Sequence, residues 1–364
     1  MAEPLHPADL RARLRALPKV DLHRHLEGAL RPETLWEFHQ ARGERRHASL
    51  AALREALIVP PGAAPGFLGF LDRFPALRFH YGGPAEIERL GREAVADAAD
   101  DGVVHLELRS SPAFLAARQL KQPDGAPPPP VELVEASAEA LVRGARTEAA
   151  RRGVSLVFIL CLGRHAGVAA NRPSAELLAR PIGAAFAAVD LAGDEQIPVA
   201  DFEELFGPWR EAGRALTLHA GEDLRGDGAA RVREAVLHHG AARIGHGVRA
   251  IEDPATVELL RTRGVPLETC LTSNVQTRAA ASFAAHPAGP LLRAGVHVTL
   301  NSDDPVVSGI TLSEDYARVR ERAGLSLDEL RRLAVNGARA AVLPAAEREA
   351  LAQRIVAAWD GALR

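Results

Sequence analysis

The 364-residue chain lacks the features that mark secreted, membrane-spanning and nucleic-acid-binding proteins. It has only two cysteines, Cys161 and Cys270, which are too few for a disulfide framework and fit a reducing compartment. No apolar run reaches the roughly 18 residues of a membrane-spanning helix, and the N-terminal segment lacks the apolar core of a signal peptide. A formal net charge of -3 gives no bulk attraction to nucleic acid or to a membrane surface. We therefore expect a cytoplasmic protein with neither kind of partner.

The chain has enough apolar material for a large core, since 47% of its residues are hydrophobic and 25% are charged. Eight short runs of strand type recur, and alanine- and leucine-rich amphipathic stretches fill most of the intervals between them. The runs are residues 19–23, 103–109, 154–161, 187–191, 215–219, 243–246, 265–270 and 296–301. Apolar strands that alternate with amphipathic helices predict parallel strands covered by helices.

Eight such strands predict an α/β fold of the (β/α)8 TIM barrel type, as a single domain over residues 1–364. An open, doubly wound sheet is the alternative, although no GxGxxG motif follows the first run. The interval between the first two runs, residues 26–102, is much longer than the others. We expect it to hold extra helices over the barrel mouth.

Polar residues gather at the C-terminal ends of five of the eight expected strands. The stretches are VDLHRHLEG, VDLAGDE, LTLHAGED, RIGHG and TLNSDDP. In a (β/α)8 barrel the loops that follow the strands open at one face, so side chains at these ends meet there. The pattern predicts a chemical site at the barrel mouth.

His23 and His25 are two residues apart, so on a strand their side chains point to the same face. Two imidazoles on one face can chelate a divalent ion, or can form an ordinary hydrogen-bonded pair. His219 adds a third candidate nitrogen, and Asp303 adds a carboxylate oxygen. Three histidines and a carboxylate suit zinc, while iron, cobalt and manganese accept the same ligand types. We expect these four side chains to form one metal site.

Asp303 and Asp304 are adjacent carboxylates after the last expected strand. Each makes the other harder to ionise, unless a cation lies beside one of them. We expect Asp303 to hold the ion and Asp304 to face a substrate. The chain must then turn at this pair, because neighbours on an extended strand point apart. The simpler interpretation is a polar turn before Pro305.

Glu222 and His246 are the candidates for moving protons at this site. Glu222 follows His219 by three residues, and burial would tune its pKa toward neutrality; the alternative is a carboxylate at the start of the next helix. His246 lies between two glycines, which allow close backbone approach, and could orient or deprotonate a bound water. The histidines expected to be surface or packing residues are His238, His239, His286 and His297.

Six motifs, in this order, are similar to those of one family. LHRHLEGAL, DLAGDE, HAGE, RIGHG, CLTSNVQT and LNSDDP resemble the adenosine deaminase family of the amidohydrolase superfamily. The likeness runs from residue 19 to about residue 350, and the bacterial adenosine deaminases are the most similar members.

The resemblance implies one zinc ion per chain and a set of site residues. The implied zinc ligands are His23, His25, His219 and Asp303. Glu222 would donate a proton to purine N1, and His246 would orient or deprotonate the bound water. Asp304 would contact purine N7, and the backbone N–H of Gly193 would contact N3. Glu27 would face the ribose 5′-hydroxyl.

The implied reaction is hydrolytic deamination of adenosine and 2′-deoxyadenosine to inosine and deoxyinosine plus ammonia. The partners are then a purine nucleoside and water, and the oligomeric state is left open. Adenine or 6-amino-6-deoxyfutalosine is the alternative substrate, since Glu27 and Arg278 depart from the family pattern near the sugar side. A non-catalytic relative is disfavoured because Glu222 and the ligands are present. A two-metal hydrolase is disfavoured because the fourth expected strand has no lysine.

Overall fold

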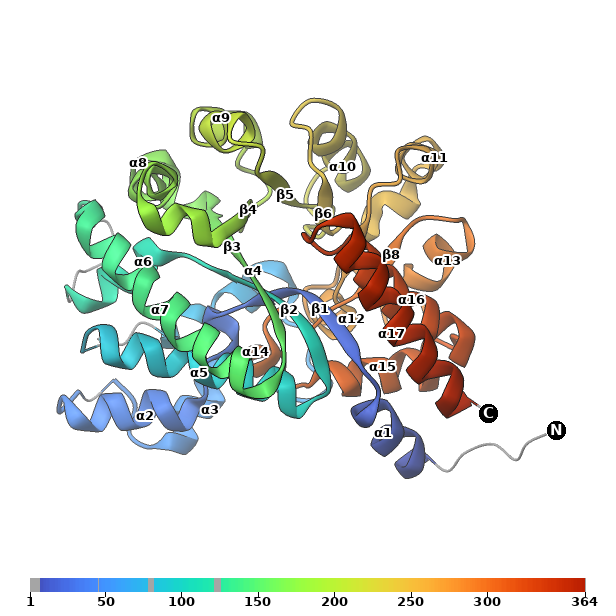
Figure 1. The fold of residues 1–364 in the computed structure, drawn as a ribbon, viewed down its shortest axis with the longest axis horizontal. Helices are drawn as coiled ribbons and strands as arrows, with labels where there is room; N and C mark the ends of the chain where they lie inside the picture. The colour runs from blue at the N-terminus through green and yellow to red at the C-terminus, as the bar shows by residue number, and fades with distance from the viewer. Residues whose placement is uncertain (1–6, 45, 78–81, 121–125, 364) are drawn as a thin grey trace.

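The computed structural model describes residues 7–44, 46–77, 82–120 and 126–363, and its centre is one sheet of eight parallel strands (Figure 1). Each strand pairs with the next one along the chain. The strands are β1 (Lys19–His25), β2 (Val103–Ser110), β3 (Ser155–Gly163), β4 (Phe186–Ala192), β5 (Ala215–Ala220), β6 (Arg243–His246), β7 (Leu267–Thr269) and β8 (Val298–Leu300). The expected (β/α)8 barrel is confirmed, and the expected strand ends differ from the observed ones by at most two residues.

The barrel closes where β1 meets the residues that follow β8. Arg24 and Asp303 form an isolated parallel bridge. The backbone N–H of His25 donates to the Asp303 carbonyl oxygen at 2.9 Å, and the N–H of Asp303 donates to the His23 carbonyl oxygen at 2.7 Å. Closure of the barrel therefore places the two histidines of β1 directly beside Asp303.

Helices connect the strands, and most of them lie on the outside of the barrel (Figure 1). Those of the N-terminal half are α1 (Pro7–Ala16), α2 (Pro32–Ala41), α3 (Leu50–Leu57), α4 (Gly66–Leu71), α5 (Pro84–Asp100), α6 (Pro112–Gln119), α7 (Val131–Arg152) and α8 (Gly167–Ala175). Those of the C-terminal half are α9 (Glu203–Glu211), α10 (Gly228–Leu237), α11 (Pro254–Arg263), α12 (Leu271–Gln276), α13 (Ala288–Arg293), α14 (Pro305–Ser308), α15 (Leu312–Glu321), α16 (Leu327–Ala340) and α17 (Ala345–Leu363). Helices α1 and α17 meet, and Arg13 Nη1 donates to the Ala362 carbonyl oxygen at 3.4 Å.

The long interval between β1 and β2 holds α2, α3, α4 and α5, as the sequence predicts. Hydrogen bonds such as the following two fasten this insertion to segments that follow the C-terminal ends of the strands. The N–H of Val59 donates to the Val307 carbonyl oxygen at 2.8 Å. Arg278 Nε donates to the Ala64 carbonyl oxygen at 2.8 Å. The inserted segment therefore lies against the barrel mouth.

The two cysteines are buried free thiols, as the composition predicts. Among the helices within the described ranges, none combines the length and the apolar content needed to cross a bilayer.

Helices α5 and α7 pack closely because glycines face the backbone of the neighbouring helix. A Cβ atom on Gly144 would lie 2.1 Å from the Glu88 carbonyl oxygen, and one on Gly91 would lie 2.8 Å from the Leu141 carbonyl oxygen. Both distances are shorter than any normal contact, so a side chain at either position would force the two backbones apart.

Replacing Gly144 with alanine should lower the free energy of unfolding by at least about 2 kcal/mol, because the added methyl group overpacks the contact of α5 with α7. Gly207 in α9 is the matched control, since a Cβ atom there meets nothing within 4 Å. Gly207→Ala should change stability by less than about 1 kcal/mol. Urea unfolding followed by circular dichroism measures both values. Equal losses in the two variants would contradict this account of the packing.

Candidate metal centre and active site

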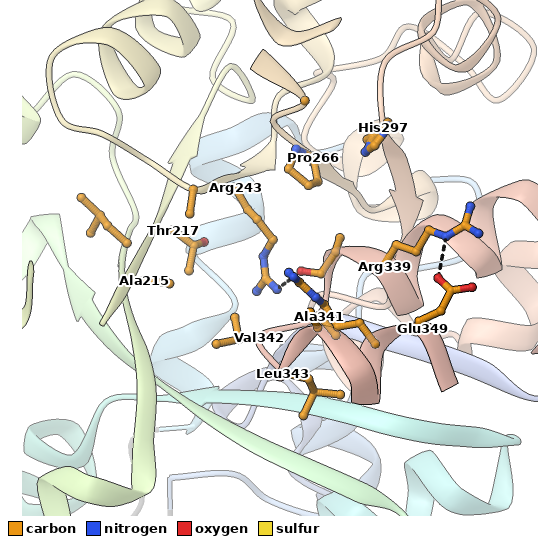
Figure 2. Close-up of a pocket in the computed structure, with 16 residues that line it drawn as sticks. Ala215, Thr217, Arg243, Pro266, His297, Arg339, Ala341, Val342, Leu343 and Glu349 are labelled. Carbon is orange, nitrogen blue, oxygen red and sulfur yellow. Dashed lines mark hydrogen bonds and ion pairs between the residues drawn. The ribbon is translucent and has the colours of Figure 1, made fainter. Parts of the chain in front are cut away.

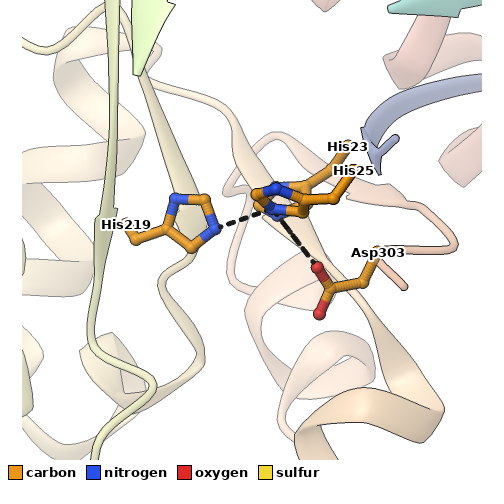
Figure 3. A group of neighbouring side chains, drawn as sticks. All are labelled: His23, His25, His219 and Asp303. Carbon is orange, nitrogen blue, oxygen red and sulfur yellow. Dashed lines mark hydrogen bonds and ion pairs between the residues drawn. The ribbon is translucent and has the colours of Figure 1, made fainter. Parts of the chain in front are cut away.

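The four side chains expected to bind a metal converge at the barrel mouth (Figure 3). His23 and His25 come from β1, His219 comes from β5, and Asp303 follows β8. Their ligand atoms all lie within 4.8 Å of one another. His25 Nε2 is 3.3 Å from the Nε2 atoms of both His23 and His219. Asp303 Oδ1 is 3.3 Å from His23 Nε2 and 3.6 Å from His25 Nε2.

The cluster has the donor chemistry and the spacing of a metal site. Metal–nitrogen bonds of about 2.0–2.1 Å in a tetrahedral site put neighbouring ligand atoms about 3.3 Å apart. The measured separations of 3.3–3.6 Å match this value. Nitrogen and oxygen lone pairs that converge in this way repel one another unless a cation lies between them. The four residues could therefore hold one metal ion.

Two buried carboxylates orient two of the histidines. His23 Nδ1 lies 2.8 Å from Glu268 Oε2, and His219 Nδ1 lies 3.1 Å from Asp190 Oδ1. Because an ionised carboxylate only accepts hydrogen bonds, each Nδ1 carries the proton and donates it. Each Nε2 then turns its lone pair toward the centre of the cluster, as a metal ligand must.

A single guanidinium holds both of these carboxylates. Arg109 Nη1 donates to Asp190 Oδ2 and Arg109 Nη2 donates to Glu268 Oε2, each at 2.8 Å. Burial opposes the charge on Glu268, but Arg109 and Arg243 hold the pKa of this carboxyl well below its usual range. The pKa of Asp190 is likewise lowered against the effect of burial, by His219 and Arg109. Both groups are therefore anions that accept from the histidines.

The sequence interpretation missed Arg109, Asp190 and Glu268. Asp190 and Glu268 are single charges inside the apolar runs AAVDLAG and VPLETC, and Arg109 ends the strand-like stretch VVHLELR, two residues after Glu107. Parallel barrel strands are buried on both faces, so a lone charge within one signals a buried pair or a ligand-orienting group. That signal was present, although it does not say which charges pair across the barrel.

Glu222 lies in the loop after β5, which a second carboxylate anchors. The Glu195 side chain accepts from the backbone N–H groups of Gly221, Glu222 and Asp223 at 2.9, 2.8 and 3.3 Å. The next helix is capped by Asp227, so Glu222 is not the capping carboxylate that was the alternative interpretation. Glu195, in the stretch DLAGDE, therefore fixes the backbone that carries Glu222.

Glu222 and His246 face each other beside the cluster. Glu222 Oε2 lies 3.3 Å from His246 Nε2, which is 4.0 Å from Asp303 Oδ2. Burial, with the nearby Asp303 charge, raises the pKa of Glu222 well above its usual value. Burial lowers the pKa of His246 well below its usual value. Burial therefore favours a protonated carboxyl at Glu222 and an uncharged imidazole at His246.

Gly245 lets the histidines approach the β6 backbone closely. A Cβ atom at Gly245 would lie 3.0 Å from His23 Cε1 and 3.2 Å from His219 Cγ. His246 itself has a φ of +59°, in the left-handed region that non-glycine residues seldom occupy. Such backbone strain is concentrated at functional sites, where it aims a side chain.

The chain turns at Asp303, which has a φ of +60°, in agreement with the expectation that neighbouring carboxylates need a turn to serve one site. Burial, with the adjacent Asp303 charge, raises the pKa of Asp304 well above its usual value. Asp304 Oδ1 is buried and has no hydrogen-bond partner in the part of the chain that the structure describes. A Cβ atom at Gly28 would lie 1.7 Å from this oxygen, so only glycine leaves room for it.

Glu27 and Gly193 lie outside the metal cluster. Glu27 is half-buried in a 3-10 turn, η1 (Glu27–Ala29), and its Oε1 accepts from the Ser111 N–H at 2.9 Å. Burial raises the pKa of Glu27 to about 7. Its charge adds to the upward shift of the Asp304 pKa. Gly193 follows β4 with a φ of +97°.

The four histidines expected at the surface or in packing positions differ in burial and in contacts. His238 and His297 are exposed, and His239 is buried against Glu203. His286 is buried as well, but its Nε2 lies 3.2 Å from Asn274 Oδ1, and Asn274 contacts His246. His286 therefore belongs to the surroundings of the site, which its position in the sequence does not indicate.

A second group of possible ligands, His246, Cys270 and Asp303, overlaps the first. It has three members and shares Asp303 with the four-residue cluster. Burial raises the pKa of the Cys270 thiol well above its usual value, and Asp303 raises it further. Because the thiolate is the form that binds metal, this group is the weaker ligand set.

A cavity of about 630 Å³ lies at the opposite end of the barrel (Figure 2). Its lining includes Ala215 and Arg243, the first residues of β5 and β6, together with Ala340. Arg243 Nε also reaches Glu268 Oε1 at 2.6 Å, so this arginine connects the floor of the barrel to the carboxylate behind His23. The cavity itself is separate from the cluster at the barrel mouth.

Comparison with known proteins gives one consistent family. The family model described as adenosine deaminase matches residues 18–358. The adenosine deaminase of Serratia proteamaculans is 35% identical over 342 residues, which cover 93% of this chain and 98% of that protein. The solved adenine deaminase of Arthrobacter aurescens has a TM-score of 0.80 and 26% identity, covering 94% of this chain and 98% of that one. A zinc-bound amidohydrolase from a Burkholderia species has a TM-score of 0.83 at 23% identity, covering 99% and 94%.

Replacing Glu268 with glutamine should weaken binding of a divalent ion, supplied as Zn²⁺, by about 10- to 100-fold, because His23 loses the anion that orients it. Glu107→Gln is the matched control. Glu107 is another fully buried glutamate that pairs with Arg243, but it contacts none of the clustered histidines. Competition with a chelator measures the affinity, and urea unfolding of the metal-free proteins measures stability. Equal losses of affinity in both variants would show that Glu268 has no special role.

Proposed function

The chain belongs to the adenosine deaminase family and is a hydrolytic deaminase, and on that premise we propose that it uses one zinc ion to convert adenosine and 2′-deoxyadenosine to inosine and deoxyinosine plus ammonia. The observation that carries the proposal is the placement of Glu222, a buried carboxyl with a raised pKa, beside a three-histidine and one-aspartate cluster at the barrel mouth. Such a site offers both parts of a hydrolytic deamination, an activated water and a proton for the ring.

His23, His25, His219 and Asp303 would hold the zinc ion. Three imidazoles and a carboxylate suit the ligand preferences of zinc, and the carboxylates behind two of the imidazoles set the tautomer that binds it. When bound, zinc lowers the pKa of a coordinated water from about 16 toward about 7, so that a nucleophile is available near neutral pH.

Glu222 would supply the proton that the ring needs. Attack of water on purine C6 pushes negative charge onto N1, and a proton from the Glu222 carboxyl neutralises it there. The raised pKa of Glu222 favours the protonated form of this carboxyl, which is the form that can supply the proton. The hydroxyl formed on C6 then passes its proton to the amino group, the C6–N6 bond breaks as the C6 carbonyl forms, and ammonia leaves. His246, 3.3 Å from Glu222, would orient or deprotonate the attacking water.

Asp304 and Gly193 would recognise the base. Purine N7 accepts hydrogen bonds, so a carboxyl contacting it must carry a proton, and the pKa of Asp304 is raised in the required direction. The partnerless buried oxygen of Asp304 supports a role toward a ligand. The backbone N–H of Gly193, after β4, would donate to N3.

Glu27 would distinguish a nucleoside from a free base, because its carboxylate would accept a hydrogen bond from the ribose 5′-hydroxyl. Adenine is the second candidate substrate, since a solved adenine deaminase shares 26% identity and the whole fold with this chain. The contacts proposed for the base do not separate adenine from adenosine. The proposed contact of Glu27 with the ribose must therefore distinguish adenosine from adenine.

Replacing Glu222 with glutamine should retain zinc and purine binding but lower turnover by at least about 100-fold, because the amide cannot give a proton to N1. Glu148→Gln in α7 is the control, since Glu148 is 7% exposed against 6% for Glu222 and lies outside the cluster. Its turnover should change by less than about threefold. Steady-state kinetics and zinc analysis measure both variants. Near-normal turnover in Glu222→Gln would remove this residue from the mechanism.

The substrate is tested by ultraviolet assay of adenosine, 2′-deoxyadenosine, adenine and 6-amino-6-deoxyfutalosine. We expect the two nucleosides to be preferred, with kcat/KM for adenine lower by about 10- to 100-fold, because adenine leaves the Glu27 carboxylate without its partner. In Glu27→Gln the ratio of kcat/KM for adenosine to kcat/KM for adenine should be smaller. Equal rates on adenine and adenosine, or a clear preference for aminodeoxyfutalosine, would overturn the choice of substrate.

A further inference from the structure

Buried hydrogen bonds connect His246 to Asn274, and Asn274 to His286. The backbone N–H of Cys270 points to Asn274 Oδ1 at a distance of 3.2 Å. A backbone N–H can only donate, so the atom that it contacts must be the amide oxygen. The other amide atom, Nδ2, is then the one that lies 3.0 Å from His246 Nδ1. Because an amide nitrogen can only donate, His246 Nδ1 accepts this hydrogen bond.

His286 gives the same orientation of the Asn274 amide independently. The backbone N–H of Ala288 donates to His286 Nδ1 at 3.1 Å, so this ring nitrogen is an acceptor and carries no proton. Burial lowers the pKa of His286 to about 3, which keeps the ring neutral with its proton on Nε2. That Nε2 lies 3.2 Å from Asn274 Oδ1 and donates to it. Two donors therefore converge on the amide oxygen.

The consequence for His246 is a single neutral tautomer. Its Nδ1 accepts from Asn274, so its proton is on Nε2, the atom that faces Glu222 and Asp303. His246, Asn274 and His286 are 1%, 0% and 3% exposed, so water does not compete for these bonds. Turning the amide over would set donor against donor at two contacts, and each unsatisfied buried group costs about 1–3 kcal/mol.

We propose that Asn274 is a positioning residue that fixes His246 with its proton on Nε2, so that His246 donates a hydrogen bond to the attacking water. This inference rests on the proposed function, because it concerns how the water is held. Of the two roles considered for His246, orientation and deprotonation, it selects orientation. The proton that the water loses then goes to solvent, because bound zinc would lower the pKa of this water toward about 7. A ring nitrogen that already carries a proton holds no lone pair with which to take one from the water.

Asn274 and His286 act through His246 and are remote from the reacting atoms in this arrangement. The sequence offers a reason for the position of Asn274, since it lies on α12, directly after β7. His286 enters from the segment before α13. The carboxylates behind His23 and His219 fix tautomers with the proton on Nδ1, whereas the Asn274 amide fixes the opposite tautomer in His246. A carboxylate partner therefore gives an imidazole the tautomer that binds metal, whereas the amide partner gives His246 the tautomer that orients water.

The test uses Asn274→Asp. A carboxylate keeps acceptors for the Cys270 N–H and for His286, but presents an acceptor in place of the donor to His246 Nδ1. The proton of His246 should therefore be found on Nδ1. Long-range ¹H–¹⁵N NMR of histidine-labelled protein reports the protonated nitrogen, in the metal-free and in the Zn²⁺-loaded enzyme. Loss of signals in His246→Gln assigns the resonances. Asn336→Asp, the same change in α16 away from the site, is the matched control.

We expect wild-type His246 to be protonated at Nε2 only and to become protonated at Nδ1 in Asn274→Asp. Turnover of adenosine should then fall at least about 10-fold with KM changed less than about threefold, because the water loses its orientation and the purine contacts remain. Asn336→Asp should change neither measurement.

A wild-type His246 that is protonated at Nδ1, or that exchanges between tautomers, would overturn the proposal. So would a tautomer change in Asn274→Asp with unchanged turnover. The wild-type spectrum decides the tautomer whether or not Asn274→Asp folds. If the wild-type enzyme deaminates no purine, the proposed function fails while the spectrum still decides the assignment for His246.

Discussion

The buried guanidinium of Arg109, between the carboxylates of Asp190 and Glu268, is the interaction on which the rest of the site depends. All three groups are fully buried, and the arginine compensates both anions, together with Arg243 beside Glu268 and His219 beside Asp190. Removing one partner from such a network leaves an uncompensated buried charge, at a cost of about 3–5 kcal/mol. The network joins β2, β4 and β7, and through His23 and His219 it also reaches β1 and β5. The charged side chains in the interior of this barrel therefore orient the histidines of the candidate metal site, in addition to forming part of the core.

A second constraint is the strained backbone at the mouth. Asp303 and His246 both adopt a φ near +60°, and each such residue costs on the order of 1–3 kcal/mol. At Asp303 the strain coincides with the closure of the barrel, where its N–H and carbonyl pair with the backbone of β1. The hydrogen bonds that close the barrel thus hold the carboxylate against the histidines. Arg278, the third non-glycine residue with positive φ, places its side chain on the carbonyl of Ala64 in the inserted segment.

The sequence predicted the parts of this structure that follow from local rules. The period of a strand places His23 and His25 on one face, and barrel topology brings His219 and Asp303 to the same end. The partners behind these ligands could not be predicted in this way. Which of Arg109, Asp190 and Glu268 meet depends on the stagger of strands around the barrel, and a sequence pattern does not contain that stagger. His286 comes from an irregular segment, and the direction of the Asn274 amide is set by contacts from distant backbone. The roles given to the site residues stay predictions, namely those of Glu222, His246, Asp304, Glu27 and Gly193.

The measurement that tests the central claim most directly is X-ray absorption at the zinc K edge of the Zn²⁺-loaded protein. The claim is that His23, His25, His219 and Asp303 form the metal site, whereas the overlapping group would include Cys270. The account predicts one zinc per chain, with nitrogen and oxygen neighbours at about 2.0–2.2 Å and three of them imidazoles. A sulfur neighbour at about 2.3 Å, fewer than three imidazoles, or a second metal near the first would contradict it.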